Sequence, residues 1–164
     1  MTRPNVDHTA PRTPQASEAV IADLMMPHQA NNLRRPSVFG GVIMSMVDRC
    51  AALSAMRHAG GQATTLSIDR ILFKEPIHVG ELVEVRSRVV HVGRTSMSVL
   101  AHVYAENIAT GERRHTNECW LTFVHLDQMG KPAPVPPLEL VTPEDRDLHA
   151  QAARRRDQSL AERT

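Results

Sequence analysis

The sequence predicts an α+β protein in which a curved antiparallel sheet wraps around one long central helix, with a second helix at the C-terminal end. Three observations lead to this fold class. Residues 40–58 form a helical pattern that is apolar on nearly every face, four later segments have the composition of strands, and short Gly-containing turns connect them. Because a helix that is apolar all round needs cover on every side, we expect a curved sheet around it and a dimer partner that closes the gap.

The elements follow one another along the chain in a simple order. Residues 19–26 are expected to form a first strand, which ends at Pro27. A long polar loop follows up to the central helix, and long loops inside compact domains are often functional. The helix ends at a Gly pair, residues 60–61. Further strands are expected at 62–73, 81–90, 97–105 and 113–126, with turns at 93–96 and 109–112 that make antiparallel hairpins.

Length and composition divide the chain of 164 residues into one domain with two flanking segments. Residues 1–16 are polar and Pro-rich, so we expect a disordered tail. Residues 17–137 hold the expected domain, and no internal repeat is apparent. Residues 138–164 are expected to form a charged surface helix, with Thr142 as its N-cap and Pro143 in its first position.

The overall charge and the aromatic content argue against several classes of partner. A net charge of +1 attracts neither nucleic acid nor an anionic membrane, and 3% aromatic residues leave little for base stacking. No apolar run approaches the roughly 20 residues of a membrane span. The N-terminus lacks the apolar segment of a secretory signal, so we expect a cytoplasmic protein.

The cysteines and histidines do not form a metal-binding motif. Cys50 and Cys119 lack C-x-x-C spacing and are interpreted as small core residues, which fits a reducing compartment. The nine histidines are scattered, without an H-x-x-x-H pair. His102 and His115 could meet across a hairpin, but we expect no metal and no cofactor.

The residues best suited to bind a ligand or to catalyse a reaction lie at the start of the central helix and about two turns into it. Gly40 and Gly41 allow the backbone to approach a ligand, and the free N–H groups of a helix start favour an oxyanion or a phosphate. Asp48 follows about two turns later among apolar residues, where a carboxylate is costly to bury unless it is used or paired. Such donors and such an acid are the parts of an acyl-transfer site. The alternatives are a structural carboxylate that caps backbone groups or pairs with Arg49 or Arg86, and a Gly pair that only permits tight packing.

A succession of motifs runs in order from about residue 20 to 137. The motifs are a loop with Asn, Phe39-Gly40-Gly41, Met46-Val47-Asp48 on the helix, and the runs 68–77, 78–81, 92–96 and 122–127. Together they resemble a known family, the hotdog-fold acyl-CoA thioesterases (acyl-CoA hydrolases) of the single-domain bacterial type. The resemblance implies the hotdog fold and hydrolysis of fatty acyl-CoA to free fatty acid and CoA.

The resemblance also implies roles for residues around the helix. Asp48 would be catalytic, as a general base or as a nucleophile, and Phe39 with the Gly pair would bind the thioester oxygen. Asn31 would position water or polarise the carbonyl. It matches the family loop when counted from Pro27, whereas counting back from Phe39 gives Asn32 with a gap. Pro36 stands where the family has Gly.

For the coenzyme A part of the substrate, the resemblance points to the turn at 93–96. Its residues Gly93, Arg94, Thr95 and Ser96, together with Arg57 and Lys74, are the expected CoA-binding residues. The run Arg154–Arg156 could also reach a phosphate, but we interpret it as solvated surface charge. Met44, Met56 and Met97 could line an acyl tunnel, although plain core positions are the preferred interpretation.

The family further implies a site between two protomers, hence a homodimer, and such dimers commonly form a trimer of dimers. Two other functions occur among proteins of this fold class. Dehydratases and hydratases of this fold place a His with the acid on the helix, and this helix has no His before His58. A non-catalytic dimer that binds acyl-CoA stays an alternative because of the altered loop around Pro36.

Overall fold

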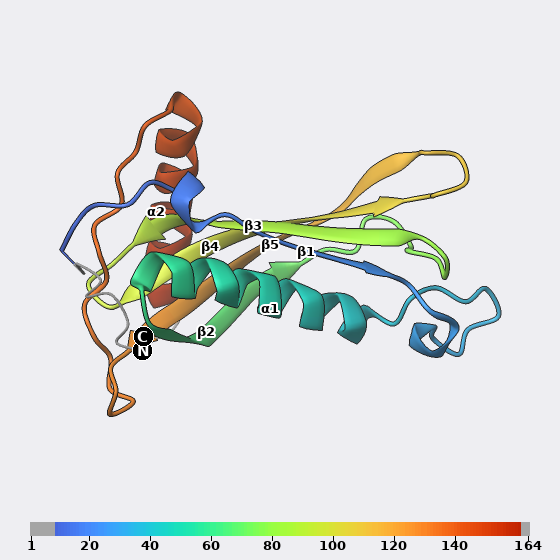
Figure 1. Ribbon diagram of the computed structural model, residues 1–164, viewed down its shortest axis with the longest axis horizontal. Coiled ribbons are helices and arrows are strands. Elements are labelled where there is room, and N and C mark those ends of the chain that lie inside the picture. The colour runs from blue at the N-terminus through green and yellow to red at the C-terminus, as the bar shows by residue number, and fades with distance from the viewer. Residues whose placement is uncertain (1–8, 162–164) are drawn as a thin grey trace, which may run out of the picture.

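The computed structural model describes residues 9–161 and has two helices on an antiparallel sheet of five strands (Figure 1). The order across the sheet is β1-β3-β4-β5-β2, and every neighbouring pair is antiparallel. The predicted fold class is confirmed, including the hairpins β3–β4 and β4–β5. The elements are η1 (Gln15–Ser17), β1 (Ala19–Leu24), η2 (Pro27–Gln29), α1 (Gly40–Ala59), β2 (Gln62–Ile71), β3 (Leu82–Val92), β4 (Ser96–Glu106), β5 (Arg113–Leu126) and α2 (Pro143–Ala161).

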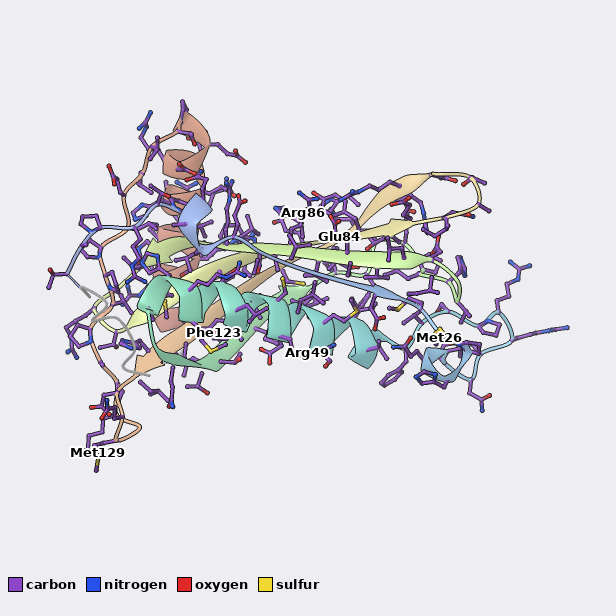
Figure 2. The ribbon with its side chains drawn as sticks, viewed as in Figure 1. Met26, Arg49, Glu84, Arg86, Phe123 and Met129 are labelled. Atoms are coloured by element: carbon purple, nitrogen blue, oxygen red, sulfur yellow. The ribbon has the colours of Figure 1, made fainter. Side chains whose placement is uncertain are left out.

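The long helix α1 buries one face against the sheet and leaves the other uncovered. Met46 and Val47 on its inner face are at most 1% exposed and join Phe123 of β5 in the core (Figure 2). On the outer face Met44 is 40% exposed, and Arg49 lies on the side of α1 away from the sheet (Figure 2). The expected cover on every side of α1 is therefore not supplied by the described part of the chain.

The second helix, α2, packs on the opposite face of the sheet. Val90, Leu100 and Trp120 come from three strands and point away from α1, because side chains alternate along a strand. They form a small apolar cluster with Ala152 of α2. The predicted start of α2 is confirmed, since Thr142 accepts a hydrogen bond from the Asp145 backbone N–H at 3.0 Å. Neither helix among the described residues is long and apolar enough to cross a membrane.

The segment before β1 is held against the domain where the structure describes it. The expected disordered tail covers residues 1–16, of which residues 1–8 lie outside the described residues. Arg12 pairs with Leu138 of the C-terminal connector, and its guanidinium donates to the carbonyls of Arg57 and His58 at 2.7 Å each. The tail prediction is therefore wrong for the segment around Arg12, because free carbonyls at the end of α1 bind that side chain.

A buried histidine near the end of α1 predicts a pH-dependent stability. His58 is 1% exposed, its Nε2 lies 3.0 Å from the Pro136 carbonyl, and its Nδ1 has no partner among the described residues. Burial lowers the pKa of His58, with a further lowering from Arg12 and an opposing rise from the Pro136 carbonyl. The contribution of neutral His58 is thus fully present above the unfolded pKa of about 6.5 and is lost as the pH falls through the lower folded pKa.

We expect the free energy of unfolding to fall on acidification, by up to about 1.4 kcal/mol per pH unit for each such group. Urea unfolding at about pH 7.5 and about pH 5.5 measures it, and His58→Gln should reduce the fall. Burial also lowers the pKa of His91 and His102, so part of the fall should persist. Exposed His28→Gln is the control and should behave as wild type. An undiminished fall in His58→Gln would contradict the assignment.

Candidate functional site

The carboxylate of Asp48 lies half-buried on the uncovered side of α1, between Ser45 and Ala52 in the helical repeat. Its Oδ1 accepts a hydrogen bond from the Thr65 hydroxyl at 2.7 Å. Neither structural pairing that the sequence suggested is present. The Arg49 guanidinium donates to the Ser45 carbonyl at 3.3 Å, and Arg86 binds Glu84 on the other side of the sheet (Figure 2). No cationic side chain that the structure describes lies within 4.0 Å of the Asp48 carboxylate, so none of those side chains neutralises it.

Thr65 is a candidate site residue that the sequence reasoning missed. The chain turns at the end of α1, where Gly60 has a φ of 69°, and β2 then runs back along the helix beside Asp48. The pairing of β2 with β5 is irregular directly after Thr65. Such a bulge re-aims a side chain next to a site. The available signal was a Thr pair in the first half of the strand that the sequence predicts directly after the helix.

At the N-terminal end of α1 the Gly pair presents a helix start that no side chain caps. The Phe73 ring lies over Gly40, 3.2 Å from the position that a Cβ would take, and the Phe39 ring lies over Gly41 at 2.5 Å. A side chain on Gly40 would therefore press against Phe73. The N–H groups and the positive end of the helix dipole make this end attractive for a partial negative charge. Phe39 itself is 60% exposed.

A cavity of about 360 Å³ opens beside this helix start. It brings together three residues that the sequence singled out: Asn31, Gly40 and Lys74. The rest of its wall is largely apolar and includes one carboxylate and one hydroxyl group. Those other lining residues are Ser37, Val38, Ile43, Phe73, Glu75, Pro76 and Ile77.

Asn31 fixes the shape of the loop that leads to α1. Its amide group donates to the Ser37 hydroxyl at 2.8 Å and its carbonyl oxygen accepts the Ser37 backbone N–H at 3.2 Å. Asn32 and Pro36 are exposed, whereas Asn31 is half-buried. Between Asn31 and Asn32, the geometry therefore favours Asn31. In this conformation the Asn31 side chain holds the loop together, as the turn interpretation of the sequence also suggested.

The turn at 93–96 lies at the other end of α1. The His125 backbone N–H donates to the Thr95 carbonyl at 2.9 Å, and the His125 ring is next to Gly61, directly after the helix. A helix of 20 residues spans about 30 Å. The turn is thus far from Gly40 and Asn31 within one chain (Figure 1).

The expected CoA-binding residues are not brought together. Arg94 is exposed on the turn, Lys74 lines the cavity at the opposite end of α1, and the Arg57 guanidinium donates to the Glu18 carbonyl. One chain alone therefore does not assemble a coenzyme site from all of them.

The remaining reactive side chains play no part in this arrangement. Burial raises the pKa of the Cys50 thiol, and it raises that of Cys119 to about 12. His102 and His115 do meet across the β4–β5 hairpin, with Nδ1 and Nε2 3.1 Å apart. No group of three His, Cys, Asp or Glu side chains in residues 9–161 could hold a metal ion.

Three comparisons relate the chain to known proteins. Residues 36–112 match the family model described as the thioesterase superfamily. The chain is similar to the uncharacterized acyl-CoA thioester hydrolase YkhA of Bacillus subtilis, with 39% identity over 139 residues, or 85% of this chain and 80% of that protein. Its fold is similar to that of an apo-hexameric acyl-CoA thioesterase, with a TM-score of 0.89, 37% identity and coverage of 94% and 98% of the two chains.

A further similar structure is the acyl-CoA hydrolase of Staphylococcus aureus in complex with butyryl coenzyme A, coenzyme A and coenzyme A disulfide. Its TM-score is 0.84 at 28% identity, with 93% of this chain and 92% of that chain covered. Forms of that hydrolase in which one Asn, one Thr or one Asp is replaced by Ala have also been characterised.

Proposed function

This chain belongs to the thioesterase superfamily, as one of its acyl-CoA thioester hydrolases, and from that premise we propose that it hydrolyses fatty acyl-CoA to free fatty acid and CoA at a site shared by two protomers. The observation that carries the proposal is the Asp48 carboxylate, oriented by Thr65 and without a cationic partner among the described residues, on the uncovered side of α1. An oriented, available carboxylate is what activation of water or direct attack on a thioester requires.

The proposed reaction divides the work among four positions. Asp48 takes a proton from a water that attacks the thioester carbonyl, or attacks that carbon itself. The N–H groups of Gly40 and Gly41 stabilise the negative charge that develops on the carbonyl oxygen. Collapse of the intermediate breaks the carbon–sulfur bond, and the sulfur takes the proton held by Asp48, so CoA leaves as the thiol. If Asp48 itself attacks, the thiolate takes its proton from water, and a second water hydrolyses the acyl–Asp48 anhydride to the free acid. Thr65 is a positioning residue, because it acts through Asp48.

Several features support a site formed by two protomers. Gly40 precedes Asp48 by eight residues, or about 12 Å along the helix, and Asp48 does not line the cavity that holds Asn31. The uncovered face of α1 lies beside β2, an edge strand whose outer backbone groups are unpaired within the described chain. A second copy on this side would cover both features and bring its own loop to Asp48. The hexameric state of a similar thioesterase further supports self-association.

The three kinds of residue replaced in the staphylococcal hydrolase support the same set here. In that protein the replaced Asp and Thr are 17 residues apart, and Asp48 and Thr65 have the same separation. The replaced Asn and Asp are 15 residues apart in that protein, whereas Asn31 and Asp48 are 17 apart here, so the separation supports only the Asp and the Thr. We assign Asn31 to the position of the replaced Asn from its place in the loop before α1, on the partner's side of the site. The apolar wall around Ile43 and Phe73 supports an acyl chain as the ligand of the cavity.

Thiol release from acyl-CoA esters of short, medium and long chains tests the activity. We expect turnover with every active substrate to yield equal amounts of free thiol and free acid, and the chain-length profile defines the substrate range. Tight binding of acyl-CoA without thiol release would contradict hydrolysis and favour the non-catalytic dimer.

A further inference from the structure

A second pocket, of about 140 Å³, lies on the sheet face that carries α2. Its wall combines hydroxyl groups from the sheet with two guanidinium groups from the C-terminal half of α2. It is distinct from the cavity at the start of α1, with which it shares no residue. The residues that line it are Leu66, Ser67, Asp69, Ser96, Ser98, Trp120, Leu121, Thr122, Ala152, Arg155, Arg156 and Ser159.

The two arginines of this pocket lie against neighbouring groups of the sheet but have no described carboxylate beside them. Arg155 lies over the Trp120 ring, 4.7 Å from its centroid, and a guanidinium nitrogen of Arg156 lies 2.5 Å from the position that a Cβ on Gly93 would take. No carboxylate in residues 9–161 comes within 4.0 Å of either one. Arg88, by contrast, has three carboxylate neighbours.

This arrangement differs from the interpretation of Arg154–Arg156 as solvated surface charge at two of the three positions. Arg154 is exposed and does not line the pocket, Arg155 is half-buried and lines it, and Arg156 is exposed but also lines it. Successive residues on a helix point in different directions, so Arg154 can lie outside the pocket that its neighbours on α2 line. The one carboxylate in the wall, Asp69, accepts a hydrogen bond from Ser67 at 3.2 Å.

The pocket is continuous with the turn at 93–96. Ser96 belongs to both, and Gly93 leaves the space that the Arg156 guanidinium occupies. Two guanidinium groups facing hydroxyl groups from Ser96, Ser98 and Thr122 suit a phosphate, which accepts charge-assisted and neutral hydrogen bonds together. The whole chain carries a net charge of only +1, so the two guanidinium groups form a local concentration of positive charge.

We propose that Arg155 and Arg156 of α2 bind the phosphate groups at the nucleotide end of the acyl-CoA substrate. This inference rests on the proposed function and extends it to a helix that lies beyond the residues matched by the family model. It makes α2 a part of the substrate-binding surface, and it gives the two arginines a role in affinity and none in the chemical step.

Calorimetric titration with CoA and with dephospho-CoA tests the proposal on the full chain. We expect the double variant Arg155→Gln/Arg156→Gln to raise the Kd for CoA by about tenfold or more, which corresponds to the loss of a charged hydrogen bond. The KM for an acyl-CoA should rise in parallel, while kcat stays within about twofold. Arg154→Gln is the matched control and should bind as wild type. Single Arg156→Gln keeps the contact between Arg155 and Trp120, so a rise in its Kd excludes loss of packing as the cause.

Two results would overturn the proposal: an unchanged Kd for CoA in the double variant, or an equal loss in Arg154→Gln. If a parallel titration with ATP then shows that the double variant binds ATP more weakly while its Kd for CoA is unchanged, the pocket belongs to a free nucleotide. A smaller preference for CoA over dephospho-CoA in the double variant would support a contact with the 3′-phosphate. Calorimetry needs no turnover, so absent thiol release would contradict the proposed function and leave this test valid.

Discussion

Replacing Asp48 with asparagine is expected to lower kcat for thiol release by about 10²- to 10⁴-fold, the usual effect of removing a general base. Asparagine has nearly the same shape and can still accept the Thr65 hydroxyl, so the structure around β2 should be kept. CoA affinity and unfolding midpoint should change little, because the carboxylate has no ion-pair partner among the described residues. Steady-state kinetics with one acyl-CoA, beside calorimetry with CoA, measures both quantities.

Two further variants sharpen this result. Thr65→Val removes the hydroxyl with little change in volume, and we expect a smaller loss in kcat, about tenfold, because the carboxylate remains but is no longer oriented. Asp23→Asn on β1 removes an exposed carboxylate and should leave kcat unchanged. Full activity in Asp48→Asn would mean that the hydrolase uses another group, and the role assigned to Asp48 would then be wrong.

Mixing two inactive variants is expected to restore activity if the site is shared between protomers. Asp48→Asn and Asn31→Ala chains should each be nearly inactive alone. In a mixed dimer, one of the two sites combines Asp48 and Thr65 from one chain with Asn31 from the other, and is intact. Random exchange makes half of the dimers mixed, so we expect about a quarter of wild-type activity per chain. Thiol release after co-refolding or co-expression of the two chains measures the gain.

The control for this experiment is a mixture of Asp48→Asn and Thr65→Val chains. Asp48 and Thr65 are in contact within one chain, so no mixed dimer of these two variants holds an intact pair. Their mixture should show only the average of the two separate activities. If Asp48→Asn and Asn31→Ala also give no more than their average, the site lies within one chain or Asn31 plays no part in it.

The order of strands and helices follows from local signals in the sequence. The alternation in β4, the Gly residues at the turns and the Thr142-Pro143 start of α2 each act over a few neighbouring residues, so their positions could be predicted. Boundaries moved by a few residues, as in β2, which ends at Ile71 and not at residue 73. Such ends depend on cross-strand pairing, which lies outside the local pattern.

Candidate site residues on α1 could be found from the sequence, but their partners could not. Asp48 stands out because an acid within an apolar helix is costly, and Gly40 and Gly41 because they precede it. Thr65 and Arg155 carry no such local signal. Each became significant only through a neighbour far away in the chain: the Asp48 carboxylate in one case, the Trp120 ring in the other.

The sequence by itself determined the fold class, the central helix and an acid on that helix, because hydrophobic periodicity and the cost of an isolated charge are local properties of a chain. Only the tertiary structure decided which side of α1 is open, what holds Asp48, and that two arginines of α2 face a pocket while their neighbour Arg154 does not. These outcomes depend on how β2 pairs at the edge of the sheet beside α1 and on how α2 packs on the opposite face. Both placements are set by long-range packing, in which each contact joins segments that are far apart in the sequence.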